Sequence, residues 1–298
     1  MFCPAKINLG LEVHHRRAED GYHYISSIFL PISFGDTMNF QISEHHQLVS
    51  LNNLPAASYH DFEKVSERGD VTKNLLWKVL EELKDHITAG VSIQLTKNIP
   101  SGAGLGGGSS DAASLLKFLK NQFSIEEKLI FNTAKKLGAD IPFFLTPSPM
   151  LVTGIGDILN PIETGDGYGI LIIPDKTVST APAYRELKRT LQSDPPPKNL
   201  SGLSEEVLTA LAESRWEKAG VLKNDFEGVV FSWYPEFAKV KDTMLEKGAL
   251  YASLSGSGSA MYSFFNGENS RNTALEEMKL SFPDYSCHSF QILNQPFD

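Results

Sequence analysis

The segment with the strongest chemical signature is a glycine-rich stretch at residues 99–111, which reads IPSGAGLGGGSSD. Five glycines in seven residues remove side-chain bulk directly before a predicted helix. Backbone N–H groups in such a loop can surround an anion, and the helix N-terminus adds the positive end of its dipole. Ser109 and Ser110 add hydroxyl groups at the same point. The pattern favours a bound triphosphate over the alternatives, a flexible linker or a tight turn.

This loop differs from three common nucleotide-binding loops. Gly102, Gly104 and Gly107 match GxGxxG, but the preceding strand alternates in hydropathy and residues 97–100 intervene. A dinucleotide-binding strand is instead a continuous apolar run that leads straight into the glycines. The chain has no GK[ST] sequence, which excludes a Walker A loop. A protein-kinase loop connects two strands, whereas this one precedes a helix, so it belongs to another class of ATP-binding site.

Phosphoryl transfer also needs a group that accepts the alcohol proton and a cation that offsets developing charge. Asp140 is the candidate base, because Gly138 and Pro142 fix a turn around it. A helix N-cap or a surface carboxylate is an equal alternative for this residue. Lys6 could hold such a carboxylate ionised, although a single lysine on a strand is normally exposed. The residue types alone leave both assignments open.

Aromatic residues in two places could recognise a nucleobase. Tyr22 and His23 follow a turn signal at Asp20-Gly21, and a phenol beside an imidazole can stack on a base and hydrogen-bond its edge. Tyr184 lies far along the chain in the sequence STAPAY. The residue types by themselves favour half-buried packing for both tyrosines.

Hydropathy patterns predict the elements that position these residues. Residues 4–13 alternate strictly, which predicts a half-buried strand with its apolar residues on one face and Lys6 and Asn8 on the other. Further strands are predicted at 28–34 and 38–42 around a turn at Gly35-Asp36, at 91–96, in a hairpin at 150–159, and at 168–174, 251–254, 260–265 and 285–292. Helices are predicted at 74–86, at 110–123, from a capping box at Ser124 and Glu127 to Gly138, and at 270–281.

These elements predict an α+β fold with antiparallel sheets and segregated helices. The length of 298 residues favours two domains. We place a soft boundary near residue 166, which gives segments 1–166 and 167–298.

Composition excludes several classes of protein. The net charge of −9 is unsuited to binding nucleic acid or an anionic membrane surface. Two cysteines without CxxC spacing make a disulfide framework or a structural zinc site improbable and suit a reducing cytoplasm. No apolar run is long enough to span a membrane, and no secretory signal is visible. We therefore expect a cytoplasmic protein with no nucleic acid or membrane partner.

Seven motifs in order resemble the GHMP kinase superfamily and cover nearly the whole chain. They are PAKINLGL (4–11), DGYH (20–23), IPSGAGLGGGSSDAA (99–113), LGADIPFFL (137–145), STAPAY (179–184), NDFE (224–227) and LSGSGSAMY (254–262). The resemblance implies two lobes, an N-terminal domain resembling a ribosomal-protein fold and a C-terminal ferredoxin-like domain, with the active site between them. It implies an ATP-dependent kinase that phosphorylates a hydroxyl of a cytidyl diphosphate substrate in the non-mevalonate isoprenoid precursor pathway. The alternatives are another small-molecule alcohol kinase of the superfamily and a catalytically silent module that binds a nucleotide or RNA.

The resemblance also implies roles for individual residues. Lys6 and Asp140 would be catalytic, with Asp140 as the base. Asn8, Tyr22, His23, Thr180 and Tyr184 would bind the substrate, the aromatic rings holding its cytosine. ATP would be bound by Asn74, Lys97, Pro100, Ser101, Gly102, Ala103, Gly104, Leu105, Gly106, Gly107, Gly108, Ser109 and Ser110. ATP and Mg²⁺ are the expected co-substrate and ion, with Ser110 near the metal and no other metal ligand assigned.

Two nearby features complete the predicted site. The resemblance implies that LSGSGS at 254–259 lines the cleft near the transferred phosphate, whereas the sequence alone is typical of a hairpin turn. Asp111 suits the helix dipole but would repel phosphate unless it is turned away or bridged by a metal. The oligomeric state has no sequence signal.

Overall fold

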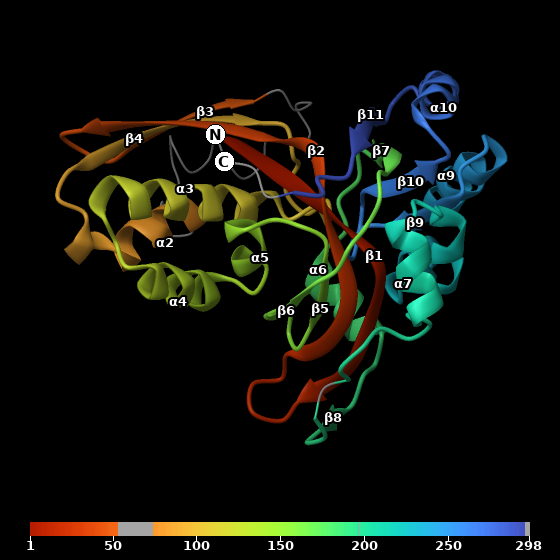
Figure 1. The fold of residues 1–298 in the computed structure, drawn as a ribbon, viewed down its shortest axis with the longest axis horizontal. Coiled ribbons are helices and arrows are strands. Elements are labelled where there is room, and N and C mark those ends of the chain that lie inside the picture. Colours follow the sequence, from red (N-terminus) through yellow and green to blue (C-terminus); the bar gives the residue numbers. More distant parts are fainter. Residues whose placement is uncertain (53–73, 196, 296–298) are drawn as a thin grey trace.

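The described residues form two sheets, of which the first has seven strands. The glycine-rich loop follows one of these strands. The computed structural model describes residues 1–52, 74–195 and 197–295. The strands are β1 (Phe2–Arg17), β2 (His23–Ser43), β3 (Gln47–Asn52), β4 (Gly90–Lys97), β5 (Met150–Thr153), β6 (Ile158–Pro161) and β8 (Leu191–Gln192). Their order is β3-β4-β2-β1-β8, with β5 paired to β2 and to β6. One face is covered by α2 (Leu75–Glu82), α3 (Gly107–Phe123), α4 (Glu127–Leu137) and α5 (Ile141–Leu145), as Figure 1 shows.

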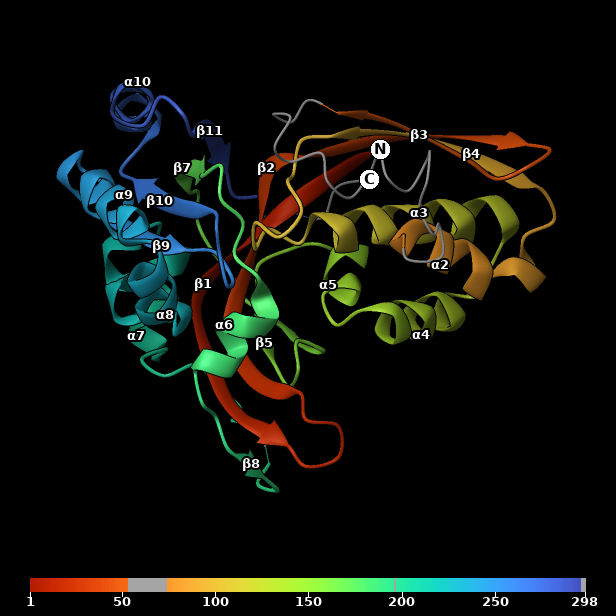
Figure 2. The same ribbon diagram turned by 180° about the vertical axis from the view of Figure 1, so that it is seen from behind.

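The second sheet has four strands, and all its pairs are antiparallel. Its order is β11 (Ser286–Gln291), β7 (Tyr168–Ile173), β10 (Met261–Phe265) and β9 (Tyr251–Leu254). The helices of this half are α6 (Thr180–Glu186), α7 (Glu205–Ala212), α8 (Phe226–Trp233), α9 (Pro235–Glu246) and α10 (Glu268–Ser281). Short 3₁₀ helices span Lys84–His86 and Trp216–Val221. From behind, α6 lies between the two sheets beside the long bent strands β1 and β2 (Figure 2).

The expected α+β class with two lobes is confirmed, and most predicted strands and helices are present. Strands β1 to β6 belong to the first sheet and β7 and β9 to β11 to the second, but β8 pairs with β1 in the first sheet. The division near residue 166 stays a prediction. No helix in the described ranges has the length and apolar character needed to cross a membrane.

Strand β1 departs from the predicted single apolar face. Ala5, Ile7 and Leu9 pack in one hydrophobic cluster, whereas Leu11 and Val13 pack in the other. The register with β2 shifts between Leu9 and Leu11, at a glycine with φ +68°. An extra residue at such a bulge moves the following side chains to the opposite face. The polar face is also buried, so the predicted half-buried strand is wrong in this respect.

The predicted turn at Gly35-Asp36 is wrong, since both residues lie within the continuous strand β2. The register against β1 shifts there by two residues on β2, so the chain bends without reversing. Asp36 is fully buried, and its carboxylate accepts backbone hydrogen bonds from Asn98 (2.6 Å) and Ile99 (2.8 Å). A residue pair typical of turns is here held in a strand by contacts with the segment that leads into the glycine-rich loop.

The predicted capping box at Ser124 and Glu127 is also wrong. Ser124 is the left-handed C-cap of α3 (φ 52°), and α4 begins at Glu127 with no side-chain cap. Gly138 ends α4 as predicted.

Candidate active site

The glycine-rich loop lies between β4 and the N-terminus of α3, as the sequence predicts. Gly102, Gly104 and Gly106 have φ angles of +73°, +77° and +72°, which L side chains rarely adopt. A Cβ on Gly104 would lie 2.1 Å from the Ser255 carbonyl oxygen, so this position has no room for a side chain. The loop thus brings backbone N–H groups to the start of a 17-residue helix, an arrangement suited to phosphate.

The second glycine loop, residues 255–260 between β9 and β10, packs directly on the first. Ser255 Oγ donates to the Gly104 carbonyl (3.0 Å), and the Ala260 N–H donates to the Ala103 carbonyl (3.1 Å). The two loops come from the two different sheets. Their contact means that residues far apart in sequence form one wall of the candidate site.

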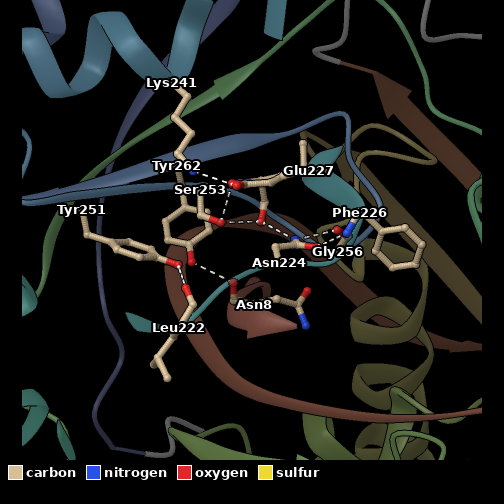
Figure 3. Close-up of polar contacts among 11 residues, drawn as sticks. Asn8, Leu222, Asn224, Phe226, Glu227, Lys241, Tyr251, Ser253, Gly256 and Tyr262 are labelled. Atoms are coloured by element: carbon tan, nitrogen blue, oxygen red, sulfur yellow. Dashed lines mark hydrogen bonds and ion pairs between the residues drawn. The ribbon is translucent and has the colours of Figure 1, made fainter. Parts of the chain in front are cut away.

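A buried hydrogen-bond network holds the second loop from behind (Figure 3). Asn224 Nδ2 donates to the carbonyls of Leu254 (2.8 Å) and Gly256 (2.9 Å). Glu227 accepts from the Leu254 N–H (3.1 Å) and pairs with Lys241 (2.7 Å). The NDFE motif at 224–227 therefore has a positioning role, which the sequence interpretation left unassigned.

Lys6 lies beside the phosphate loop, on the buried polar face of β1. Its N–H donates to the Leu105 carbonyl (2.9 Å), its Nζ donates to Asn8 Oδ1 (2.5 Å), and its ammonium lies 4.7 Å from the centre of the Phe29 ring. Burial lowers the pKa of Lys6, and the negative charge of Asp140 opposes this shift. Lys6 and Asp140 therefore act on each other electrostatically, although they are far apart in the chain, and their catalytic roles stay a prediction.

Asp140 lies at the start of α5, but its side chain does not cap that helix. Asp140 is thus the N-cap residue by position, as that alternative expected, but its carboxylate makes no cap hydrogen bond. Burial and the Asp140 charge together raise the pKa of the Tyr184 phenol to about 12. A Cβ at Gly156, in the β5–β6 turn, would lie 3.6 Å from Asp140 Oδ1. The carboxylate therefore lies close to the β5–β6 turn, and its charge acts on Lys6 of β1 and Tyr184 of α6.

Tyr22, His23 and Tyr184 line a cavity of about 920 Å³. Ala139, the residue before Asp140, lines the same cavity. The His23 and Tyr184 rings are in contact, with centroids 4.9 Å apart, while Tyr22 is 64% exposed. Thr180 also lines the cavity, and its Oγ1 lies 3.0 Å from Ser257 Oγ in the second glycine loop. Four of the five predicted substrate residues thus line one cavity, and Asn8 is not among its lining residues. A base enclosed between His23 and Tyr184 would first have to separate these rings.

Lys97 lies beneath the phosphate loop with its charge already compensated. Its Nζ donates to Asp36 (2.5 Å) and Asp111 (2.8 Å), and all three side chains are buried. Burial acts to lower the pKa of Lys97, but the attraction of both carboxylates outweighs it and raises that pKa above its usual value. Asp111 is therefore turned away from the phosphate site. The contact between Lys97 and ATP stays a prediction, and the structure gives Lys97 a supporting position under the loop.

The other residues assigned to ATP binding differ in how far they are buried. Asn74 caps α2 by accepting the Leu76 N–H (2.8 Å). Ser110 Oγ is buried and has no hydrogen-bond partner among the described residues, so it remains available to a ligand. Ser101, Gly102 and Gly108 are exposed, and Ser109 is half-buried.

Two family models match this chain. They are the GHMP kinases N terminal domain at residues 74–147 and the GHMP kinases C terminal domain at residues 207–284. A 4-diphosphocytidyl-2-C-methyl-D-erythritol kinase from Leptospira biflexa is 38% identical over 96% of this chain and 96% of its own length, and one from Leptospira interrogans is 40% identical over 97% and 99%. This chain is a GHMP kinase.

Solved structures agree with this membership. A crystal structure of 4-(cytidine 5′-diphospho)-2C-methyl-D-erythritol kinase has a TM-score of 0.76 and 30% identity, and covers 98% of each chain. Homoserine kinase from Cytophaga hutchinsonii has a TM-score of 0.69 at 19% identity, covering 99% of this chain and 94% of its own, which shows the shared fold. Within the GHMP kinases the chain belongs to the 4-diphosphocytidyl-2-C-methyl-D-erythritol kinase family, as the seven motifs indicated.

Proposed function

We propose that this GHMP kinase transfers the γ-phosphoryl group of ATP to the 2-hydroxyl of 4-diphosphocytidyl-2-C-methyl-D-erythritol. The observation that carries the proposal is the convergence of Lys6 and Asp140 beside the double glycine loop and next to an aromatic cavity. The relatives named for this reaction match nearly the whole chain. A cytoplasmic biosynthetic enzyme without a nucleic acid partner fits the net charge of −9 and the two free cysteines.

The proposed mechanism assigns a role to each group. Asp140 accepts the proton of the attacking hydroxyl, because its carboxylate is not used as a helix cap. Lys6 keeps Asp140 ionised and offsets charge that develops on the transferred phosphoryl group. Asn8 orients the Lys6 ammonium through its 2.5 Å hydrogen bond. The backbone of the first glycine loop holds the ATP phosphates.

The residues at the loop also fit Mg²⁺ bound with ATP. No three His, Cys, Asp or Glu side chains gather as metal ligands within the described ranges. Magnesium in kinases is typically held by substrate phosphates and one or two protein oxygens. Ser110 Oγ, a buried hydroxyl without a partner in the described part of the chain, can supply such an oxygen. When bound, the ion would neutralise charge on the phosphate oxygens.

The test is ATP consumption with Mg²⁺ and each of four alcohols: 4-diphosphocytidyl-2-C-methyl-D-erythritol, mevalonate, homoserine and galactose. We expect turnover with the first only. Asp140→Asn should lower kcat by about 10²–10⁴ and leave ATP affinity unchanged. Turnover of a control alcohol in place of the cytidyl substrate would identify a different kinase of the same family. Loss of ATP affinity in the variant would reassign Asp140.

A further inference from the structure

The aromatic cavity carries a strong positive charge in a protein that is otherwise acidic. Four cationic residues line it, Arg16, Arg185, Lys188 and Arg189, against the single carboxylate of Asp20. The chain as a whole has a net charge of −9. Asp20 is already paired with Arg17, Lys188 with Glu186 and Arg189 with Asp225, whereas the ion pairs of the described residues include neither Arg16 nor Arg185. None of these cations has a role in the mechanism above.

Two of the guanidinium groups are held in place by the protein. Arg16 Nε donates to the Gly21 carbonyl (3.1 Å), and within the described ranges Arg16 forms no ion pair. Arg189 donates to Asp225 (2.7 Å), whose carboxylate also accepts the Val13 N–H (2.9 Å). Since an arginine has five N–H donors, each group keeps several free for a ligand. Fixed arginines with unused donors are suited to binding phosphate oxygens in pairs.

The two arginines lie next to each other and next to the aromatic rings. The Arg16 N–H donates to the Thr190 carbonyl (2.8 Å), which places the residue after Arg189 against β1. Burial lowers the pKa of His23, and the positive charges of Arg16 and Arg189 lower it further. His23 in turn contacts Tyr184. A neutral aromatic pair therefore lies beside two cations, which is the arrangement that a nucleobase linked to phosphates requires.

We propose that Arg16 and Arg189 bind the diphosphate of the cytidyl substrate and so determine that this kinase accepts a nucleoside diphosphate derivative in place of a simple alcohol. This inference rests on the proposed function and adds to it the residues that recognise the diphosphate. Alcohols without a diphosphate would offer no phosphate oxygen to the unused N–H donors of the two guanidinium groups. Specificity would then come from charge as well as from stacking on Tyr184.

Calorimetric titration of the full-length protein with CDP and with cytidine separates these contributions. The wild type should bind CDP at least about ten-fold more tightly than cytidine, because charge-assisted hydrogen bonds to phosphate are present only with CDP. Arg16→Gln and Arg189→Gln should each weaken CDP binding about ten-fold and leave cytidine binding unchanged. The matched control is Arg215→Gln, since Arg215 pairs with a carboxylate at 2.8 Å and is 41% exposed, as against 40% for Arg189.

The binding results distinguish failure of the diphosphate site from failure of the proposed function. Equal affinity of the wild type for CDP and cytidine would overturn the diphosphate site and keep the cytidine site. Binding of neither ligand would overturn the proposed function as well. An equal loss of CDP affinity in Arg215→Gln would show a general charge effect and contradict the inference. Loss of cytidine binding in both cavity variants, with melting temperatures unchanged, would show that the arginines shape the aromatic site and do not read the diphosphate.

Discussion

Replacing Lys97 by methionine should destabilise the protein strongly, because it removes the cation that pairs with two buried carboxylates. Asp36 and Asp111 have exposed fractions of 0% and 2%, and both are bonded to the Lys97 ammonium. Asp111 Oδ1 has no hydrogen-bond partner within the described residues. Methionine nearly keeps the length of the lysine side chain, so the change removes charge more than volume.

The expected loss is about 3–5 kcal/mol, the usual cost of leaving a buried charge without its partner. The matched control is Lys136→Met, whose ammonium bonds to Glu82 at 2.6 Å on the surface and is 65% exposed. This control should lose no more than about 1 kcal/mol, because solvent screens an exposed pair. Adding Asp111→Asn to Lys97→Met should restore part of the loss by removing one of the two facing charges.

The loss should also depend on pH in a defined direction. Burial raises the pKa of Asp111 to about 7 in the wild type, even against the attraction of Lys97. A carboxyl whose pKa is higher in the folded state stabilises the fold at low pH and ceases to do so as the pH rises through that value. Without Lys97 this pKa rises further, so the difference between variant and wild type should be larger at pH 8 than at pH 5.

Urea unfolding at pH 5 and pH 8 measures both effects. The KM for ATP serves as a second readout, because Asp36 also fixes the backbone at Asn98 and Ile99 that leads into the phosphate loop. We expect Lys97→Met to raise that KM. A loss below about 1 kcal/mol, equal at both pH values, would refute the interpretation of these three residues as a compensated buried cluster.

Three further predictions concern other parts of the site. Gly104→Ala should lower the melting temperature and raise the KM for ATP, because the added Cβ would collide with the Ser255 carbonyl oxygen. The control Gly108→Ala has open space around its added Cβ and should keep the wild-type melting temperature. Equal melting temperatures of the two variants would contradict this prediction. Tyr184→Ala should raise the KM for the cytidyl substrate about ten-fold and spare kcat, and an unchanged KM would exclude stacking. Glu227→Ala should cost about 1–3 kcal/mol in urea unfolding and Glu227→Gln clearly less, since glutamine still accepts the backbone N–H behind the second loop.

Local patterns in the sequence predicted the parts of the site that local sequence determines. Strict alternation placed Lys6 and Asn8 on one polar face of β1, and they are hydrogen-bonded to each other there. The closely spaced glycines, followed by apolar residues at helical spacing, predicted the phosphate loop and the helix α3. Such features depend on residues within one or two turns of chain, and a single sequence contains that information.

Features set by contacts between distant segments were not predictable in the same way. The Gly35-Asp36 pair has the composition of a turn, but Asp36 is fixed by Lys97, which is 61 positions away. The role of Arg189 depends on Asp225 and on pairing with β1, neither of which its neighbours in sequence indicate. The bulge at Gly10 likewise changed which cluster Leu11 joins. In each case tertiary pairing overrides a correct local tendency.

Strand β1 explains why a catalytic pair can form from residues so far apart in the chain. Its Lys6 N–H bonds to the first glycine loop through Leu105. Two residues later the Asn8 carbonyl accepts a hydrogen bond from the Tyr262 hydroxyl (2.7 Å), which belongs to the second sheet. Further on, Leu11 pairs with Asn224, the residue that holds the second glycine loop. Because one continuous strand bonds to the first loop and to the residue that holds the second, and carries Lys6 and Asn8, backbone geometry sets the position of Lys6 relative to the phosphate site.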